Sequence, residues 1–134
     1  MKEEFRTLTK YRLKRAYESL EEAKILLEQG HANTFVNRLY YACFYAVSAL
    51  LLLNGFFSSK HSGIRSLFHQ KFIRTGLVAQ GLGKLYGRLF NKRQEGDYSD
   101  LVLFEVKEVS NWYEEAKEFV ETVEEIIKKE IHKK

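Results

Sequence analysis

None of the 134 residues of this chain is proline, and most of its eight glycines lie between segments with helical periodicity. Proline is the strongest helix breaker, so its complete absence favours a chain that is mostly helical. The length suits one domain, and an apolar share of 45% is enough to form a hydrophobic core. We therefore expect one all-α domain over residues 1–134, with its core at about residues 10–127.

The spacing of apolar residues predicts five helices. The first covers residues 5–28, with apolar positions three and four residues apart. The second covers residues 33–53 and begins at a capping asparagine or threonine. It is apolar on nearly all sides, which is typical of a central helix packed by several neighbours or by a second subunit. A third helix follows the capping residues 58–62, and a shorter fourth covers residues 82–92 until Gly96 breaks it.

The fifth predicted helix has the most regular pattern and is capped by Ser99 or Asp100. Its apolar positions alternate strictly between spacings of four and three, at Val102, Val106, Val109, Tyr113, Ala116, Val120, Val123 and Ile127. Such a seven-residue repeat is typical of helical bundles and coiled coils. The sequence therefore predicts an antiparallel up-and-down bundle of four or five helices. Its apolar surface exceeds what one small bundle can easily cover, so we also expect a homodimer or a stable partner.

Charge and cysteine content limit the class of protein further. The net charge of +4 permits an anionic partner, although a solvated surface with a slight lysine excess explains it equally simply. The single cysteine, Cys43, excludes an internal disulfide and lies in the most apolar segment, as a small core residue would. No secretory leader pattern is visible, and the apolar run at residues 39–53 is shorter than the ~20 residues that span a bilayer. We expect a cytoplasmic protein that does not enter the membrane.

Three blocks place polar or ionisable residues at the ends of otherwise apolar helices. In the first, Arg38 either holds a phosphate, pairs with a carboxylate of another helix, or extends to solvent, and Asn37 and Tyr41 lie close to it in sequence. In the second, His61 opens a helix, where the helix dipole favours the neutral imidazole.

In the third block, Arg93 and Asp97 flank Gly96, and Tyr98 follows directly. Ordinary helix-end and turn chemistry would explain this pair, with Tyr98 as a packing residue. The histidines lack the spacing of metal ligands, and the chain has no glycine-rich phosphate loop, so we expect neither a metal nor a cofactor.

Taken together, the blocks Asn-Arg-x-Tyr-Tyr-Ala-x-Phe, Lys-His-x-Gly and Arg-x-x-x-Asp-Tyr resemble the HEPN domain (higher eukaryotes and prokaryotes nucleotide-binding), and in particular its small stand-alone prokaryotic members. The resemblance implies a dimeric helical bundle that works with a separate small nucleotidyltransferase, often as toxin and antitoxin. Active members of the family are metal-independent ribonucleases. In these an arginine stabilises the phosphate charge, and a histidine after a short polar spacer assists attack by the ribose 2′-hydroxyl.

Carried onto this chain, the resemblance assigns the motif arginine to Arg93 and the motif tyrosine, approximately, to Tyr98. Asp97 stands where the histidine is expected, and a carboxylate with a pKa near 4 is a poor general base at neutral pH. Ribonuclease activity is therefore left open. His61 could supply the imidazole only if folding or dimerisation brings it to Arg93. A nucleotidyltransferase partner could instead modify Tyr98 with a nucleotide.

Two hypotheses about function follow, and a third is weaker. The chain is either a toxin-like component that binds nucleotide or RNA, or a non-catalytic dimeric interaction module or nucleotide-binding partner subunit. In the first case the binding groove is lined by Asn37, Arg38, Tyr41, His61, Arg93, Asp97 and Tyr98. In the second case Arg93 and Asp97 form an intramolecular ion pair. Nonspecific RNA binding is disfavoured by the weak net charge and by the lack of a basic stripe, and no DNA partner is expected.

Overall fold

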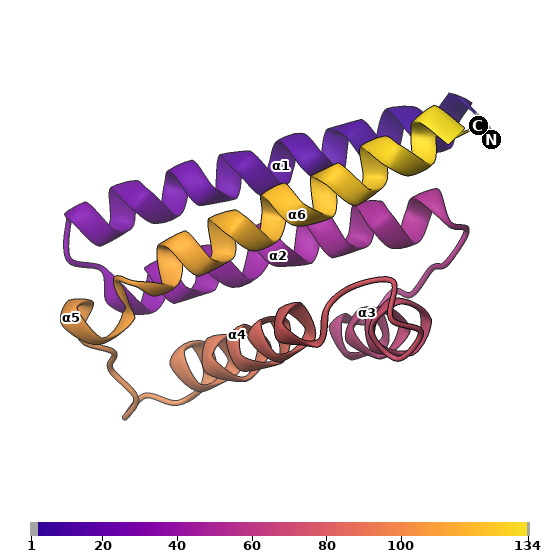
Figure 1. Ribbon diagram of the computed structural model, residues 1–134. Coiled ribbons are helices and arrows are strands. Elements are labelled where there is room, and N and C mark those ends of the chain that lie inside the picture. The colour runs from indigo at the N-terminus through magenta and orange to yellow at the C-terminus, as the bar shows by residue number, and fades with distance from the viewer. Residues whose placement is uncertain (1–2, 134) are drawn as a thin grey trace.

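The computed structural model describes residues 3–133, and all of the regular structure in this range is helical (Figure 1). The prediction of an all-α bundle is confirmed. In chain order the elements are α1 (Glu3–Glu28), α2 (Ala32–Leu53), α3 (His61–Phe68), the single π-helical turn η1 (His69–Ile73), α4 (Gln80–Tyr98), the short α5 (Val106–Val109) and α6 (Trp112–Lys133).

Helix α2 forms the centre of the bundle and contacts α1, α3, α4, α5 and α6. Fifteen of its 22 residues are buried, which confirms the prediction drawn from its all-round apolar surface. Cys43 is fully buried, and this burial raises the pKa of its thiol. By length and composition α2 could cross a membrane, but 72% of its most apolar stretch is buried inside the bundle, as in the core helix of a globular domain.

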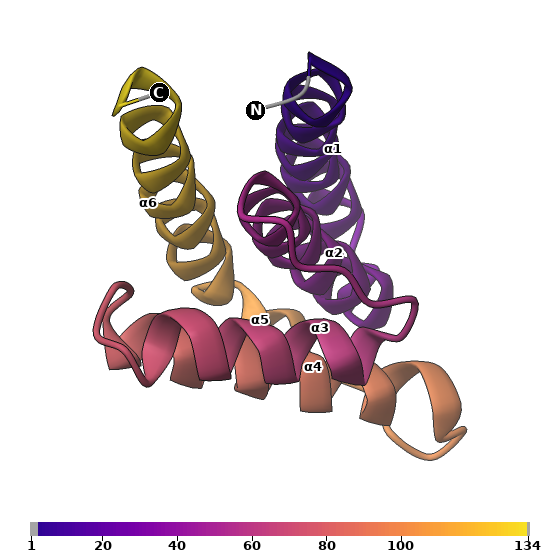
Figure 2. The same ribbon diagram turned by 90° about the vertical axis from the view of Figure 1, so that its right-hand side faces the viewer.

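The other helices form two groups around α2. The long helices α1, α2 and α6 lie side by side, and the beginning of α1 and the end of α6 share one end of the bundle (Figure 1). Helices α3 and α4 run across this group at a steep angle, as Figure 2 shows. Gly30, Gly55 and Gly76 follow the ends of helical segments, and each has a φ near +80°, a conformation that other residues adopt only with strain.

The predicted break at Gly96 is wrong, because α4 continues through it to Tyr98. A Cβ atom at this position would lie 2.8 Å from the ring of Phe104, and the Gly96 carbonyl accepts a hydrogen bond from Asn33 at 3.3 Å. The glycine therefore allows a loop to approach the helix closely and does not end the helix.

The predicted start of the last helix at Ser99 or Asp100 is also wrong. Residues 99–105 form a turn and an extended segment, and the long helix α6 begins only at Trp112. Asn33 explains the difference: its amide nitrogen donates to the Val102 carbonyl at 2.8 Å, and its amide oxygen accepts from the Phe104 N–H, also at 2.8 Å.

The side chain of Asn33 thus supplies hydrogen bonds that a helix would have supplied from its own backbone. Asn33 is not the cap of α2, because His31 occupies the N-cap position. The predicted seven-residue repeat of apolar positions is confirmed within α6, where Ala116, Val120, Val123 and Ile127 are all buried.

We predict that Asn33→Ala lowers the free energy of unfolding by about 1–3 kcal/mol, because it leaves a part-buried N–H and a carbonyl of the 99–105 loop without partners. Denaturant unfolding would measure the change, and amide exchange of Phe104 should become faster. Asn111→Ala on an exposed position is the matched control. Equal stability of the two variants would contradict this account of the loop.

Candidate functional site

The first turns of α2 and the last turns of α4 meet, although about 60 residues separate them in sequence. The side chain of Asn37 on α2 donates a hydrogen bond to Asp97 Oδ2 on α4 at 2.8 Å. Asn37 and Arg38 of the first block thereby join Arg93 and Asp97 of the third block in one place.

Arg93 lies at the centre of this site, with only 5% of the residue exposed. Its guanidinium carbon is 4.6 Å from the centre of the Tyr40 ring and within 6.0 Å of the ring centres of Tyr41, Phe90 and Tyr98. Such faces attract a cation.

The charge of Arg93 is only partly compensated within residues 3–133. Its carboxylate contact there is Asp97, with Nη1 and Oδ2 3.9 Å apart, and its buried Nε has no hydrogen-bond partner among the described residues. A buried guanidinium with an unsatisfied donor retains capacity to bind an anion.

Arg38 is oriented by two other side chains and belongs to the same network. Its Nε and Nη2 donate to Asn37 Oδ1 at 2.9 and 2.6 Å, and its Nη1 contacts Glu22 of α1 at 3.4 Å. Of the three sequence-based alternatives, the structure shows a pair with a carboxylate of another helix. Its guanidinium also lies 4.8 Å from the centre of the Tyr41 ring. Asn37 therefore connects Arg38 to Asp97, and Asp97 connects to Arg93.

The second block reaches this site through Tyr40. His61, the first residue of α3, has its Nδ1 2.7 Å from the Tyr40 hydroxyl and stacks on Phe44 at 4.4 Å between ring centres. The face of the same Tyr40 ring carries the Arg93 guanidinium. Folding of a single chain thus brings His61 to Arg93, with one tyrosine ring between them.

Burial and the nearby charge of Arg93 both lower the pKa of His61, and burial is the larger cause. Burial also raises the pKa of Tyr40 to about 12, so its hydroxyl keeps its proton at neutral pH. The lowered pKa of His61 fits the neutral imidazole expected at this helix start, and the tautomer of the ring decides which partner donates in the 2.7 Å contact.

The expectation that Tyr98 is a packing residue is wrong, because its side chain is not buried. At 76% exposure it lies at the end of α4 beside Arg93. Its position is open to solvent. Within residues 3–133, the His, Cys, Asp and Glu side chains form no group of three that could hold a metal ion.

Two residues of the site were missed by sequence reasoning. Tyr40 is fully buried in the hydrophobic core, and its hydroxyl and ring face also connect His61 to Arg93. A buried tyrosine needs a partner for its hydroxyl, and that was the available signal. Asn33 gave no such signal, because its partners are backbone groups some 63–71 residues away.

Residues 9–129 match the HEPN domain family, which covers nearly the whole chain, and the protein therefore belongs to this family. It is 45% identical over 120 residues to a UPF0332 protein of Thermotoga maritima, covering 90% of this chain and 91% of that one. It is also 35% identical over 86 residues to a Methanocaldococcus jannaschii protein named "Putative toxin", covering 64% of this chain and 58% of that one. The family resemblance stated for the three sequence blocks is confirmed.

We predict that His61 titrates below 6.5, the usual value for histidine, and that Arg93→Met moves its pKa upward without restoring the usual value, because burial remains. Since the folded-state pKa lies below that of the unfolded chain, His61 protonates first in the unfolded state. The free energy of unfolding should therefore fall as the pH drops below about 6.5.

Histidine ring signals followed by NMR over pH 4–8 would measure the pKa, with Arg88→Met as a control that removes an exposed arginine ion-paired to Glu115. A larger shift in the Arg88 variant than in the Arg93 variant would contradict the proximity of Arg93 to His61.

Proposed function

We propose that this HEPN protein is the toxin-like component of a two-protein system and binds a phosphate group of a nucleotide or RNA at Arg93. The observation that carries the proposal is the buried guanidinium with an unsatisfied Nε and a single carboxylate contact at 3.9 Å. The name of the Methanocaldococcus jannaschii relative supports the toxin-like role. A separate small nucleotidyltransferase is the proposed partner, on the basis of the family resemblance.

Each side chain of the site has a role in this proposal. Arg93 binds the phosphate, while Asn37 holds the Asp97 carboxylate, which in turn orients the guanidinium. Arg38 adds a second positive charge beside Asn37, and Tyr41 contributes its ring face to both arginines.

Phosphate binding is better supported than RNA cleavage. Nδ1 of His61 is occupied by its contact with the Tyr40 hydroxyl at 2.7 Å, and the Tyr40 ring, not His61, lies against the Arg93 guanidinium. The neighbouring Asp97 is ion-paired and is a weak base at neutral pH. Metal-independent cleavage would require the imidazole of His61 to reach the ribose 2′-hydroxyl of an RNA bound at Arg93, and it is the second candidate function.

We predict that Arg93→Met weakens binding of AMP by about 10- to 100-fold, because a charge-assisted hydrogen bond contributes roughly 1.5–3 kcal/mol. Methionine retains the packing against Tyr40, and removal of a buried charge should not lower the melting temperature. Isothermal titration with wild type, Arg93→Met and the control Arg88→Met would measure this. Equal AMP affinity in all three proteins would refute phosphate binding at Arg93.

Wild type and Arg93→Met also decide the question of cleavage in an RNA assay that contains EDTA. Cleavage by wild type that disappears in Arg93→Met would establish a metal-independent ribonuclease. Intact RNA together with Arg93-dependent AMP binding would establish a binding subunit without this activity.

The proposed homodimer would form at the apolar loop beside the site. Leu101 and Leu103 are 94% and 81% exposed, and they lie three and five residues after the exposed Tyr98. Exposed apolar side chains that lie together favour a surface that a second molecule covers.

We predict that Leu101→Ser with Leu103→Ser shifts the protein toward the monomer, because these side chains would lose their apolar contacts across the interface. Sedimentation velocity would measure the association state. Leu77→Ser, at another exposed leucine, is the control. A dimer of unchanged stability in the double variant would place the interface elsewhere.

A further inference from the structure

Basic and acidic residues are distributed unevenly along the chain, although its net charge is only +4. Residues 29–94 contain nine of the 22 basic residues and none of the 18 acidic ones. This stretch therefore carries +9, while the remaining 13 basic and 18 acidic residues give the rest of the chain −5. The small net charge of the whole chain therefore understates the positive charge of residues 29–94.

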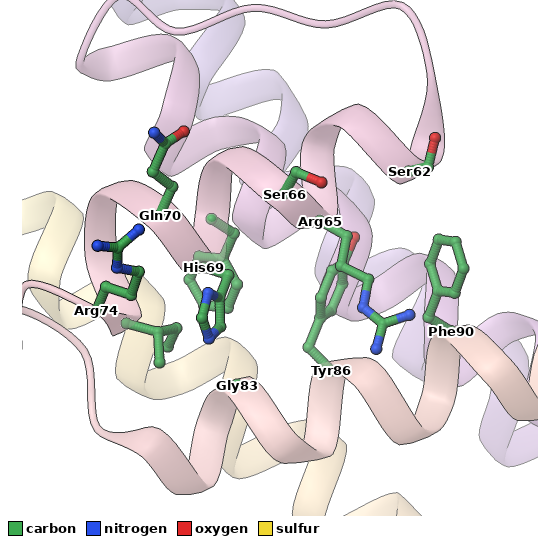
Figure 3. Close-up of a pocket in the computed structure, with 11 residues that line it drawn as sticks. Ser62, Arg65, Ser66, His69, Gln70, Arg74, Gly83, Tyr86 and Phe90 are labelled. Atoms are coloured by element: carbon green, nitrogen blue, oxygen red, sulfur yellow. The ribbon is translucent and has the colours of Figure 1, made fainter.

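A groove on this basic part of the molecule lies between the α3–η1 segment and α4. Its main cavity has a volume of about 600 Å³, and Figure 3 shows Ser62, Ser66 and Gln70 on the α3–η1 side and Gly83 and Tyr86 on the α4 side.

A second cavity of about 470 Å³ continues from the first and shares Arg65, His69, Ile73 and Gly83 with it. We call the two together the basic groove. No carboxylate lines either cavity.

The cations of the basic groove are largely uncompensated. Arg65, Arg74 and Lys84 line it and form no ion pair within residues 3–133, whereas Arg88 pairs with Glu115 of α6. Arg65 is held at the wall by a contact with the Phe90 ring at 4.8 Å and by a hydrogen bond to Asn91 at 3.4 Å. Positive side chains lining one groove without counter-charges favour a ligand with several negative charges.

Two glycines on α4, one turn apart, shape the wall of the groove. A Cβ atom at Gly87 would lie 2.8 Å from Arg65 Nη2, and one at Gly83 would lie 3.1 Å from the Ile73 side chain. A glycine inside a helix is less favourable than an alanine at the same position. Side chains of α3 and η1 can therefore lie directly against the backbone of α4, and the guanidinium of Arg65 is held at the groove wall.

The basic groove ends next to the Arg93 site. Phe90 lines the groove, and its ring is contacted by Arg65 at 4.8 Å and by Arg93 at 6.0 Å. One aromatic ring thus separates the last cation of the groove from the phosphate site proposed above. The volume suits a strand of a few nucleotides and not a double helix.

We propose that the basic groove binds the phosphate backbone of single-stranded RNA and directs the strand toward Arg93. The direction of the strand rests on the proposed function, but backbone binding in the groove does not. The cations bind successive phosphates as point charges, and the hydroxyl and amide groups of Ser62, Ser66 and Gln70 provide additional hydrogen-bond donors.

Fluorescence anisotropy with a labelled 12-nucleotide uridine RNA tests the proposal. The variant is Arg65→Gln/Arg74→Gln/Lys84→Gln, and its control is Lys14→Gln/Lys24→Gln/Lys117→Gln, which removes three exposed cations of α1 and α6. We expect the groove variant to lose at least tenfold in affinity and its salt dependence to fall by about two, since each phosphate contact on a single strand contributes about 0.7 to that slope. The control should stay within twofold of wild type.

Equal RNA affinity of the groove variant and its control would overturn the proposal. Tighter binding of the corresponding deoxyuridine strand would overturn the assignment to RNA, whereas equal or weaker binding agrees with it. AMP titrations separate the two sites: the groove variant should keep its AMP affinity, while Arg93→Met loses it. If Arg93→Met kept its AMP affinity while the groove variant lost RNA affinity, the proposed function would be refuted. The proposal that the basic groove binds RNA would still be supported.

Discussion

The burial of α2 on all sides is the constraint on which the rest of this structure depends. Its neighbours α1, α4 and α6 cover different faces of one helix, so the bundle is organised around it and not around a shared layer. The first turns of α2 carry the polar residues Asn33, Asn37 and Arg38. The end of α4 packs against these turns. The polar site forms where the central helix meets a neighbour through hydrogen bonds in place of apolar contacts.

Burying Arg93 at this junction is energetically unfavourable unless other groups compensate for the lost hydration. The face of Tyr40 provides part of that compensation, and Asp97 provides another part through a contact at 3.9 Å that is long for an ion pair. The Nε of Arg93 has no hydrogen-bond partner among the described residues, so its lost hydration is not compensated. A fully satisfied arginine would stabilise the fold but would have little reason to bind a ligand, and this incomplete satisfaction is what separates a site from a structural ion pair.

Periodicity predicted most of the fold because each helix buries one stripe or, in α2, its whole surface. Periodicity failed at Gly96 and Val102, where tertiary contacts decide the local structure. Gly30 ends a helix and Gly96 does not, because only Gly96 has the ring of Phe104 against it. Val102 matched the heptad by position, yet its carbonyl is bound by Asn33 outside any helix. The motif residues of the site were predictable, whereas Tyr40, which connects them, and the basic groove needed the packing of α3 against α4.

Arg93 and His61 are coupled through charge. Arg93 helps to keep His61 neutral, so an anion bound at Arg93 would offset that charge and favour protonation of His61. By thermodynamic reciprocity, protonated His61 would then favour the bound anion to the same degree. His61 stands one ring from Arg93, and the basic groove ends one ring from Arg93 on another side. A strand that reaches Arg93 along the groove would thus bring negative charge next to the arginine whose own charge lowers the pKa of His61.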